Sequence, residues 1–354
     1  MQAILGILFH CIGGFASGSF YLPYKKVKGW AWESYWIVGG LFSWLLIPLF
    51  AAWCTVPNFT DIIRDSPISV LGWTYLMGLL WGIGGLTFGL SMRYLGMSLG
   101  MSVALGFCSA FGALVPSFYY NWYPKPTKVS FTEMLQSHSG QLVLLSVLVC
   151  LVGITICGKA GMRKEKELSP EQQQAGVQEF NLVKGLLVAV VSGMLSACFS
   201  FGIEAGKPMA EVAQRAAEAA GTSTLFVNNV VFVVILLGGL TTNFIWCMIL
   251  NYRNRTFSDY TNPKAPLTNN YLFSAMAGTT WFLQFFFYGM GETKLGNGAS
   301  SWILHMASII IVSNLWGIRF GEWKGVSQTT YRQLLMGVGV ILVSVLLGGL
   351  AKLL

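Results

Sequence analysis

The sequence predicts an all-α integral membrane protein whose ten transmembrane helices form two inverted five-helix repeats. Three observations support this prediction: the composition, a series of long apolar runs, and short patterns that recur five runs apart. Hydrophobic residues make up 54% of the 354 residues and charged residues only 10%. Because a soluble domain carries roughly 25% charged residues, lipid must be the solvent over most of this surface.

Ten apolar runs approach the roughly 20 residues that a helix needs to cross a bilayer. Backbone polar groups in lipid must pair within their own segment, so each run is expected to be a helix. The runs fall at 3–22, 35–55, 69–90, 95–118, 141–160, 183–203, 225–250, 271–291, 299–318 and 333–352.

The basic residues predict how these helices are oriented. Most of the 22 Lys and Arg residues lie in the odd-numbered loops, with groups at 25–28, 159–166 and 253–264. Loops rich in Lys and Arg stay on the cytoplasmic side. We therefore expect both termini on the outside, which is the periplasm in a Gram-negative cell. The net charge of +8 reflects these loops and does not indicate a nucleic-acid surface.

Short patterns link runs that lie five apart. Residues 81–96 (WGIGGLTFGLSMRYLG) share Trp, Gly, Leu and Gly positions with 281–296 (WFLQFFFYGMGETKLG). A weaker similarity relates 16–26 to 197–207, and the fifth and tenth runs both open with Gln-Leu. Three similarities in the same order indicate two related halves.

The halves divide the chain into a first repeat at 1–160, a cytoplasmic linker at 161–182 and a second repeat at 183–354. Five crossings per repeat insert the second repeat upside down, an arrangement that many secondary transporters share, with the substrate site near the membrane midplane. The alternative is a ten-helix bundle with incidental similarity, which could be a channel, an intramembrane enzyme or a scaffold.

The motifs that the sequence lacks reduce the number of functional classes to consider. The sequence holds no phosphate-binding loop, no zinc-protease motif and no Ser/His/Asp set, so neither ATP-driven transport nor an enzyme is favoured. No filter-like loop or ring of like charges indicates a channel. The seven cysteines form no C-x-x-C pair and are interpreted as small core residues, and no metal or other cofactor is expected.

Polar residues inside a membrane helix face a partner or water, so polar stripes predict which helices line a path. Runs five and ten lack such a stripe and are assigned to the periphery, against lipid or a second copy of the chain, as a homodimer. Close helix packing is the alternative explanation for the serines. The stripes are Thr280, Gln284, Tyr288 and Glu292 in the eighth run; Ser192, Ser196, Ser200 and Glu204 in the sixth; Asn297, Ser301, His305 and Ser308 in the ninth; and His10, Gly14, Ser17 and Tyr21 in the first.

A gradient-driven carrier needs a group that binds the coupling ion. Histidine titrates near neutral pH, and burial raises the pKa of a carboxyl. His305, His10 and Glu33 are therefore the expected proton-coupling residues, although a structural role is the alternative for each histidine. Glu204 and Glu292 lie near the ends of their runs, where solvation explains them equally well.

The aromatic residues suggest a substrate. Trp and Tyr faces pack against the C–H faces of sugars, while amides and imidazoles bind the hydroxyls. We expect the substrate to be a small, polar, uncharged solute. Aromatic residues beside the lysines of the first loop (Trp30, Trp32, Tyr35 and Trp36) are interpreted instead as a belt at the membrane interface. The expected substrate-binding residues are Gln284, Trp281, Tyr288, Trp302, Trp81 and Tyr21.

Five segments resemble the L-rhamnose–proton symporter family of the drug/metabolite transporter superfamily. The resemblance implies ten helices and uptake of L-rhamnose, or a related deoxy sugar, with a proton across a bacterial inner membrane. A drug or metabolite exporter and a non-transporting membrane sugar sensor are the alternatives. The segments are YLPYKKVKGWAWESYW at 21–36, WGIGGLTFGLSMRYLGMSLG at 81–100, EFNLVKGLLVAVVSGMLSACFSFGIEAGKPM at 179–209, WFLQFFFYGMG at 281–291 and SWILHMA at 301–307.

Overall fold

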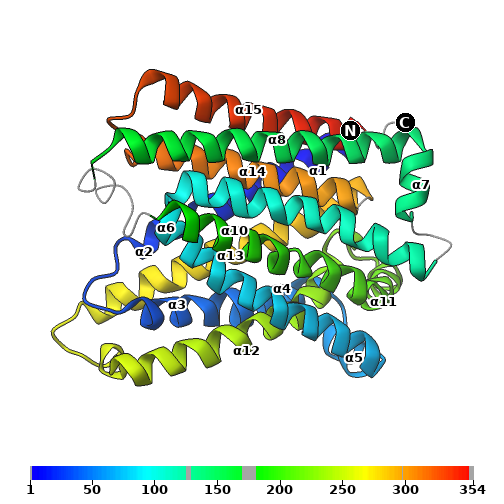
Figure 1. Ribbon diagram of the computed structural model, residues 1–354. Helices are drawn as coiled ribbons and strands as arrows, with labels where there is room; N and C mark the ends of the chain where they lie inside the picture. Colours follow the sequence, from blue (N-terminus) through cyan, green and yellow to red (C-terminus); the bar gives the residue numbers. More distant parts are fainter. Residues whose placement is uncertain (1, 125–128, 170–180, 297, 351–354) are drawn as a thin grey trace. The chain divides into compact units, whose positions relative to one another are not determined.

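The computed structural model describes residues 2–124, 129–169, 181–296 and 298–350, and this part of the chain is helical without any strand (Figure 1). Half of the expected linker, residues 170–180, and Asn297 of the ninth-run stripe lie outside the described residues. The long helices are α1 (Gln2–Ser19), α3 (Trp32–Leu41), α4 (Ile47–Thr55), α6 (Ile68–Trp122), α8 (His138–Glu167), α10 (Leu182–Ser196), α11 (Cys198–Ala219), α12 (Asn229–Asn254), α13 (Leu267–Leu295), α14 (Gly298–Arg319) and α15 (Gln328–Leu350). The short elements are α2 (Tyr21–Tyr24), the π-helix η1 (Phe42–Leu46), α5 (Phe59–Arg64), α7 (Phe131–Gln136), and the 3₁₀ turns η2 (Thr224–Phe226) and η3 (Phe257–Tyr260).

Nine helical segments in the described part of the chain are long and apolar enough to cross a membrane. They correspond to nine of the ten expected runs. The remaining run, 271–291, is helical as expected but belongs to α13, whose Asn, Thr, Gln and Glu residues make it too polar to count by composition. The all-helical membrane fold is thus confirmed, whereas the tenth crossing stays a prediction.

The expected break between the third and fourth runs lies within α6. Gly96 has φ 81° and ψ 172°, which is not helical backbone, and it separates the spans Ile68–Gly96 and Leu99–Trp122. A positive φ is accessible to glycine without steric cost. One glycine therefore ends the first span.

The chain forms two compact units. Unit 1 contains Met1–Ile83 and Cys198–Lys294, and unit 2 contains Gly84–Ala197 and Leu295–Leu354. Each unit draws on both of the expected repeats, so compact packing and the internal repeat are separate properties. The repeat itself stays a prediction.

In unit 1, α12 packs against α3, η1, α4 and α11. Gly39 of α3 and Gly278 of α13 bring two backbones into direct contact, because a Cβ on Gly278 would overlap the carbonyl of Gly39. Small residues permit such close approach in membranes, where van der Waals packing replaces the hydrophobic effect between helices. This contact fixes α13 against α3.

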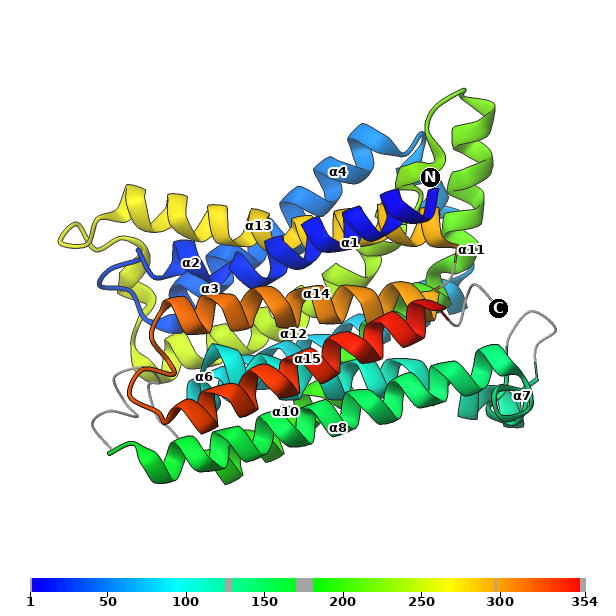
Figure 2. The same ribbon diagram turned by 90° about the horizontal axis from the view of Figure 1, so that it is seen from above.

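In unit 2, α8 and α15 lie side by side along their length, as both Figure 1 and Figure 2 show. Gly153 and Gly337 permit the approach, and a Cβ on either glycine would meet the other's carbonyl oxygen at 2.9–3.0 Å. Beyond the span, the Glu167 carboxylate accepts hydrogen bonds from the hydroxyls of Thr330 (2.6 Å) and Ser327 (2.8 Å). These bonds join the end of α8 to the start of α15.

The cysteines depart in part from the expectation of a core role. No disulfide is formed among the described residues, and Cys108, Cys150, Cys157, Cys198 and Cys247 are buried as expected. Cys11 of α1 and Cys54 of α4 are exposed instead. Each lies on the outer face of its helix, which the helical period and not the residue type decides.

Candidate functional site

Trp281 of α13 is the centre of an aromatic cluster in unit 1. Its ring stacks on Phe20 at a centroid distance of 4.5 Å and lies 5.3 Å from Trp36, 5.3 Å from Trp44 and 6.3 Å from Trp81. All five side chains are buried. We call these five residues the Trp281 cluster. It brings two expected binding residues, Trp81 and Trp281, together.

A local turn of the backbone positions the indole of Trp44, and a side-chain hydrogen bond positions the indole of Trp36. Trp44 lies in the π-helix η1, and π-turns inside α-helices occur frequently at functional sites. Its six-membered ring lies over Gly40, where a Cβ would collide with it. The indole Nε1 of Trp36 donates to Oδ1 of Asn243 at 2.9 Å, which holds the ring from α12.

Several buried polar atoms of unit 1 have no hydrogen-bond partner among the described residues. The amide Nε2 of Gln284 is one, three residues after Trp281 on the buried face of α13. The indole Nε1 of Trp44 and the hydroxyl of Ser43 are two more, both from η1. The hydroxyls of Thr74 and Ser274 and the indole Nε1 of Trp30 are also without a partner in this part of the chain. Buried polar groups in proteins are nearly always hydrogen-bonded, so these unpaired atoms are candidates for contact with a polar ligand.

His10 and Tyr288 meet one turn further along α13. Their rings lie 5.3 Å apart in an edge-on arrangement, and both are buried. Gly291 makes room for the imidazole, since a Cβ there would lie 2.6 Å from Nε2. An expected proton-coupling residue and an expected binding residue are therefore in contact.

Glu33 has a different environment. It lies in the first turn of α3, and its Oε1 accepts hydrogen bonds from the Asn254 amide and the Thr256 hydroxyl, each at 2.9 Å. The negative charge also lies at the favourable end of the helix dipole. These contacts give Glu33 a structural role at the end of α12, and its proton-coupling role stays a prediction.

Trp302 and His305 belong to unit 2. Both side chains are buried in α14. Trp302 Nε1 donates to the carbonyl of Cys108 at 3.3 Å, and Gly112 leaves space for its ring. The expected site residues are thus distributed over both units, with Tyr21, 5.6 Å from Phe20, beside the cluster in unit 1.

Comparisons with known proteins identify the family. The model of the L-rhamnose-proton symport protein (RhaT) family matches residues 1–353. The chain belongs to this family. Proteins named L-rhamnose-proton symporter from Pectobacterium atrosepticum, Yersinia pestis and Yersinia pseudotuberculosis are each 36% identical to it over 352 residues. Each alignment covers 98% of this chain and 97% of the relative.

Symporter family members carry sugar and proton without a covalent step, so the site needs binding groups and not a nucleophile. Among the described residues, no group of three or more His, Cys, Asp or Glu side chains could hold a metal ion. The polar groups around the cluster are amide, indole and hydroxyl, which bind neutral hydroxylated ligands.

Sequence reasoning missed three members of the Trp281 cluster. Phe20 lies outside the polar stripe of the first run, and Trp44 lies in the second run, to which no polar stripe is assigned. Trp36 was interpreted as part of an interfacial belt with Trp30, and this interpretation is wrong, because the two side chains are only 1% and 8% exposed. The spacing of Trp32, Trp36 and Trp44 at four and eight residues is the signal that predicts one aromatic face.

Proposed function

We propose that this chain takes up L-rhamnose together with a proton across a bacterial inner membrane, by alternating access. The observation that carries the proposal is the Trp281 cluster, an aromatic surface buried in a membrane protein and flanked by hydrogen-bonding atoms that have no partner in the described part of the chain. Membership of the symporter family supplies the sugar and the coupling ion. No contact favours the alternatives, an exporter or a non-transporting sensor.

The cluster suits a 6-deoxy sugar. Its aromatic faces carry negative charge density and attract the weakly positive C–H bonds and the methyl group of the pyranose. Gln284 Nε2 and Trp44 Nε1 are donors for ring hydroxyls, and Ser43 can donate or accept. Trp281, Trp81, Tyr21 and Tyr288 provide the remaining surface in unit 1. Trp302 of unit 2 stays an expected substrate-binding residue.

Hydrogen bonds at both ends of α13 support a tenth crossing. Near its start, the Asn270 side chain bonds to the backbone N–H and carbonyl of Lys28, and the Tyr271 hydroxyl donates to the Tyr260 carbonyl. Near its end, Glu292 accepts from the Asn228 amide at 3.0 Å. Asn228 and Tyr260 lie at opposite ends of α12, which is a candidate span, so α13 runs antiparallel to it over the same depth.

The pairing of helices supports the inverted repeat. α3 packs on α12 in unit 1 and α8 packs on α15 in unit 2, and each pair joins elements five crossings apart. Two repeats, 1–160 and 183–354, would produce such pairs through their pseudo-twofold relation. Leu148 of α8 and Leu346 of α15 are 59% and 66% exposed, so this pair would face lipid or a second subunit.

Contacts between loops support the orientation. The first loop bonds to the seventh through Ala31 and Asp259, and the segments around the second and sixth loops bond through Thr55 and Asn229. Odd loops thus contact odd loops, and even loops contact even ones. With the basic odd loops in the cytoplasm, both termini lie in the periplasm.

His305, His10 and Glu33 are the candidate proton carriers. A proton taken up from the periplasm enters a negative interior, where the potential supplies about 2.3 kcal/mol per charge per 100 mV. Substituting the carrier should abolish accumulation of sugar while leaving exchange of labelled for unlabelled sugar intact. His10 is a candidate from unit 1 and His305 from unit 2.

Uptake of labelled L-rhamnose into proteoliposomes with an imposed pH gradient tests the proposal. An inward proton gradient is expected to raise both initial rate and accumulation, with alkalinisation of the outer medium. Gln284→Ala should raise KM and Leu283→Ala, a partly exposed neighbour on the other face of α13, should not. Efflux-only activity would indicate an exporter, binding without translocation would indicate a sensor, and either result contradicts proton-coupled uptake.

A further inference from the structure

A cavity lies in unit 1 and involves no member of the Trp281 cluster. It has a volume of about 630 Å³ and is formed by residues 53–60 and 222–226, at the end of α4, around α5 and at η2. This volume is within the usual range for small-molecule sites, about 300–1,000 Å³. The two segments belong to the second and sixth loops, on the side where the proposed orientation places the periplasm.

The walls of this cavity are held by contacts from three elements. Asn58 adopts the left-handed conformation (φ 55°) and turns the chain from α4 into α5. Ile62 of α5 is buried, and α5 packs on α11. The Asn229 amide at the start of α12 donates to the Thr55 hydroxyl at 2.9 Å. The turn is therefore tied to residues far away in the sequence.

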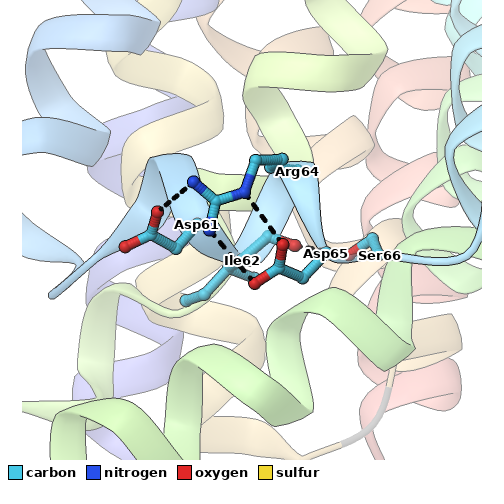
Figure 3. A network of polar contacts seen from close by, with 5 residues as sticks. All are labelled: Asp61, Ile62, Arg64, Asp65 and Ser66. Carbon is cyan, nitrogen blue, oxygen red and sulfur yellow. Dashed lines mark hydrogen bonds and ion pairs between the residues drawn. The ribbon is translucent and has the colours of Figure 1, made fainter.

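Arg64 stabilises the end of α5, as Figure 3 shows. Its guanidinium contacts Asp61 Oδ1 at 3.0 Å and Asp65 Oδ1 at 2.9 Å, so one cation joins two carboxylates. These three charged residues do not line the cavity. The charges of Arg64, Asp61 and Asp65 pair with one another at the end of α5, and the lining of the cavity is neutral.

The lining resembles the Trp281 cluster in its chemistry. Trp53, Phe59 and Phe226 provide aromatic surface, and Asn58 provides an amide. Hydroxyls come from Thr55, Thr60, Thr222 and Ser223. Not one of the lining residues is charged. Aromatic faces with hydroxyls and an amide, and without charge, bind a neutral polyhydroxylated ring and exclude ions.

We infer that this cavity is a second binding site for a neutral monosaccharide, separate from the transport site and on the side from which the sugar enters. The choice of L-rhamnose as its ligand rests on the proposed function. The site would hold the sugar before it reaches the transport site.

Cys54 offers a direct test because it lines the cavity and is exposed. Cys11 of α1 is also exposed at the protein surface and does not line the cavity, but it lies within the candidate span Ile4–Tyr24 and would face lipid. With a membrane-permeant maleimide, it is an internal control. The full chain in lipid nanodiscs is treated with a maleimide, and labelling of each cysteine is followed by mass spectrometry. At L-rhamnose about ten times its dissociation constant, labelling of Cys54 should slow about tenfold, since the free fraction falls as 1/(1 + [L]/Kd). Labelling of Cys11 should not change.

Two variants separate this site from the transport site. Gln284→Ala, in the transport site, should keep the protection of Cys54, whereas Trp53→Ala should lose most of it. Trp73→Ala is the matched control, because Trp73 is 58% exposed, against 70% for Trp53, and does not line the cavity. Equal labelling of Cys54 in Trp53→Ala and wild type without sugar verifies that the turn is folded.

Absence of protection in wild type overturns the inference, as does protection that disappears in Gln284→Ala or that extends equally to Cys11. If uptake of L-rhamnose persists in these cases, the proposed function stands without a second site. If wild type shows protection but no proton-dependent uptake, the second site stands and the proposed function fails.

Discussion

Replacing Asn243 with alanine removes the hydrogen-bond partner that holds Trp36 in the Trp281 cluster. Asn243 is 1% exposed and makes three bonds: it accepts from Trp36 Nε1 at 2.9 Å and donates to the carbonyls of Gly239 (2.9 Å) and Gly82 (3.3 Å). Alanine leaves the indole N–H buried without an acceptor. An orphaned buried donor costs about 1–3 kcal/mol, so Asn243→Ala should lower the free energy of unfolding by about that amount.

The coupling energy between Trp36 and Asn243 tests this hydrogen bond more directly than the single substitution does. In Trp36→Phe no N–H remains to be orphaned, so the added Asn243→Ala change should cost less than it does in wild type. Polar pairs between membrane helices contribute about 0.6 kcal/mol on average and about 1.7 at most, and we expect a coupling energy in this range. Equilibrium unfolding in mixed micelles gives all four free energies, with the exposed Asn269→Ala as control.

The transport assay supplies a second measurement. Trp36 lies 5.3 Å from Trp281, so a loosened Trp36 ring should raise KM for sugar more than it lowers kcat. If the four unfolding free energies are additive to within about 0.5 kcal/mol, the Trp36–Asn243 bond does not stabilise the fold as argued, and the reasoning fails.

Two further predictions concern helix contacts outside the site. Gly278→Leu should abolish monodisperse folded protein in size-exclusion chromatography, because a side chain there overlaps Gly39, whereas Gly72→Ala, with open space around it, should have no such effect. Hydrogen bonds from Thr330 and Ser327 hold the pKa of Glu167 below its ordinary value of 4.5. This stabilisation is present above pH 4.5 and is lost as the pH falls through the lowered pKa, so Tm should drop on acidification. Glu167→Gln should remove that part of the pH dependence, and an unchanged profile would contradict the role of this cap.

The spans could be predicted from the sequence because lipid imposes a simple rule: each crossing needs a long apolar helix. Nine expected runs agree with nine candidate spans to within a few residues at most ends, and the break at Gly96 separates two of them. α13 departs from the rule because it is shielded by protein. Its buried face carries Asn270, Ser274 and Gln284, and these polar residues lower the mean hydropathy of the helix although they do not face lipid.

Part of the cluster could not be predicted because the direction of a side chain depends on tertiary packing. On α13, Gln284 and Tyr288 of the predicted stripe lie on the buried face of one regular helix, together with Trp281. That this face lines a substrate path stays a prediction. The stripe argument gave no signal at Trp44, which lies in the π-helix Phe42–Leu46, because the second run carries no polar stripe. It also failed at Trp36, whose neighbouring lysines suggested an interface although its indole points to Asn243.

Hydrogen bonding, more than burial, separates structural polar groups from those available to a ligand. Asn243 and Gln284 are both buried amides in long helices of unit 1, at 1% and 5% exposure, and the sequence treats them alike. The Asn243 side chain makes three bonds to protein, whereas Gln284 Nε2 has no partner among the described residues. An unpaired buried amide costs free energy. The proposed binding of a sugar hydroxyl by Gln284 therefore predicts that added L-rhamnose raises Tm in wild type and Asn243→Ala, but much less in Gln284→Ala.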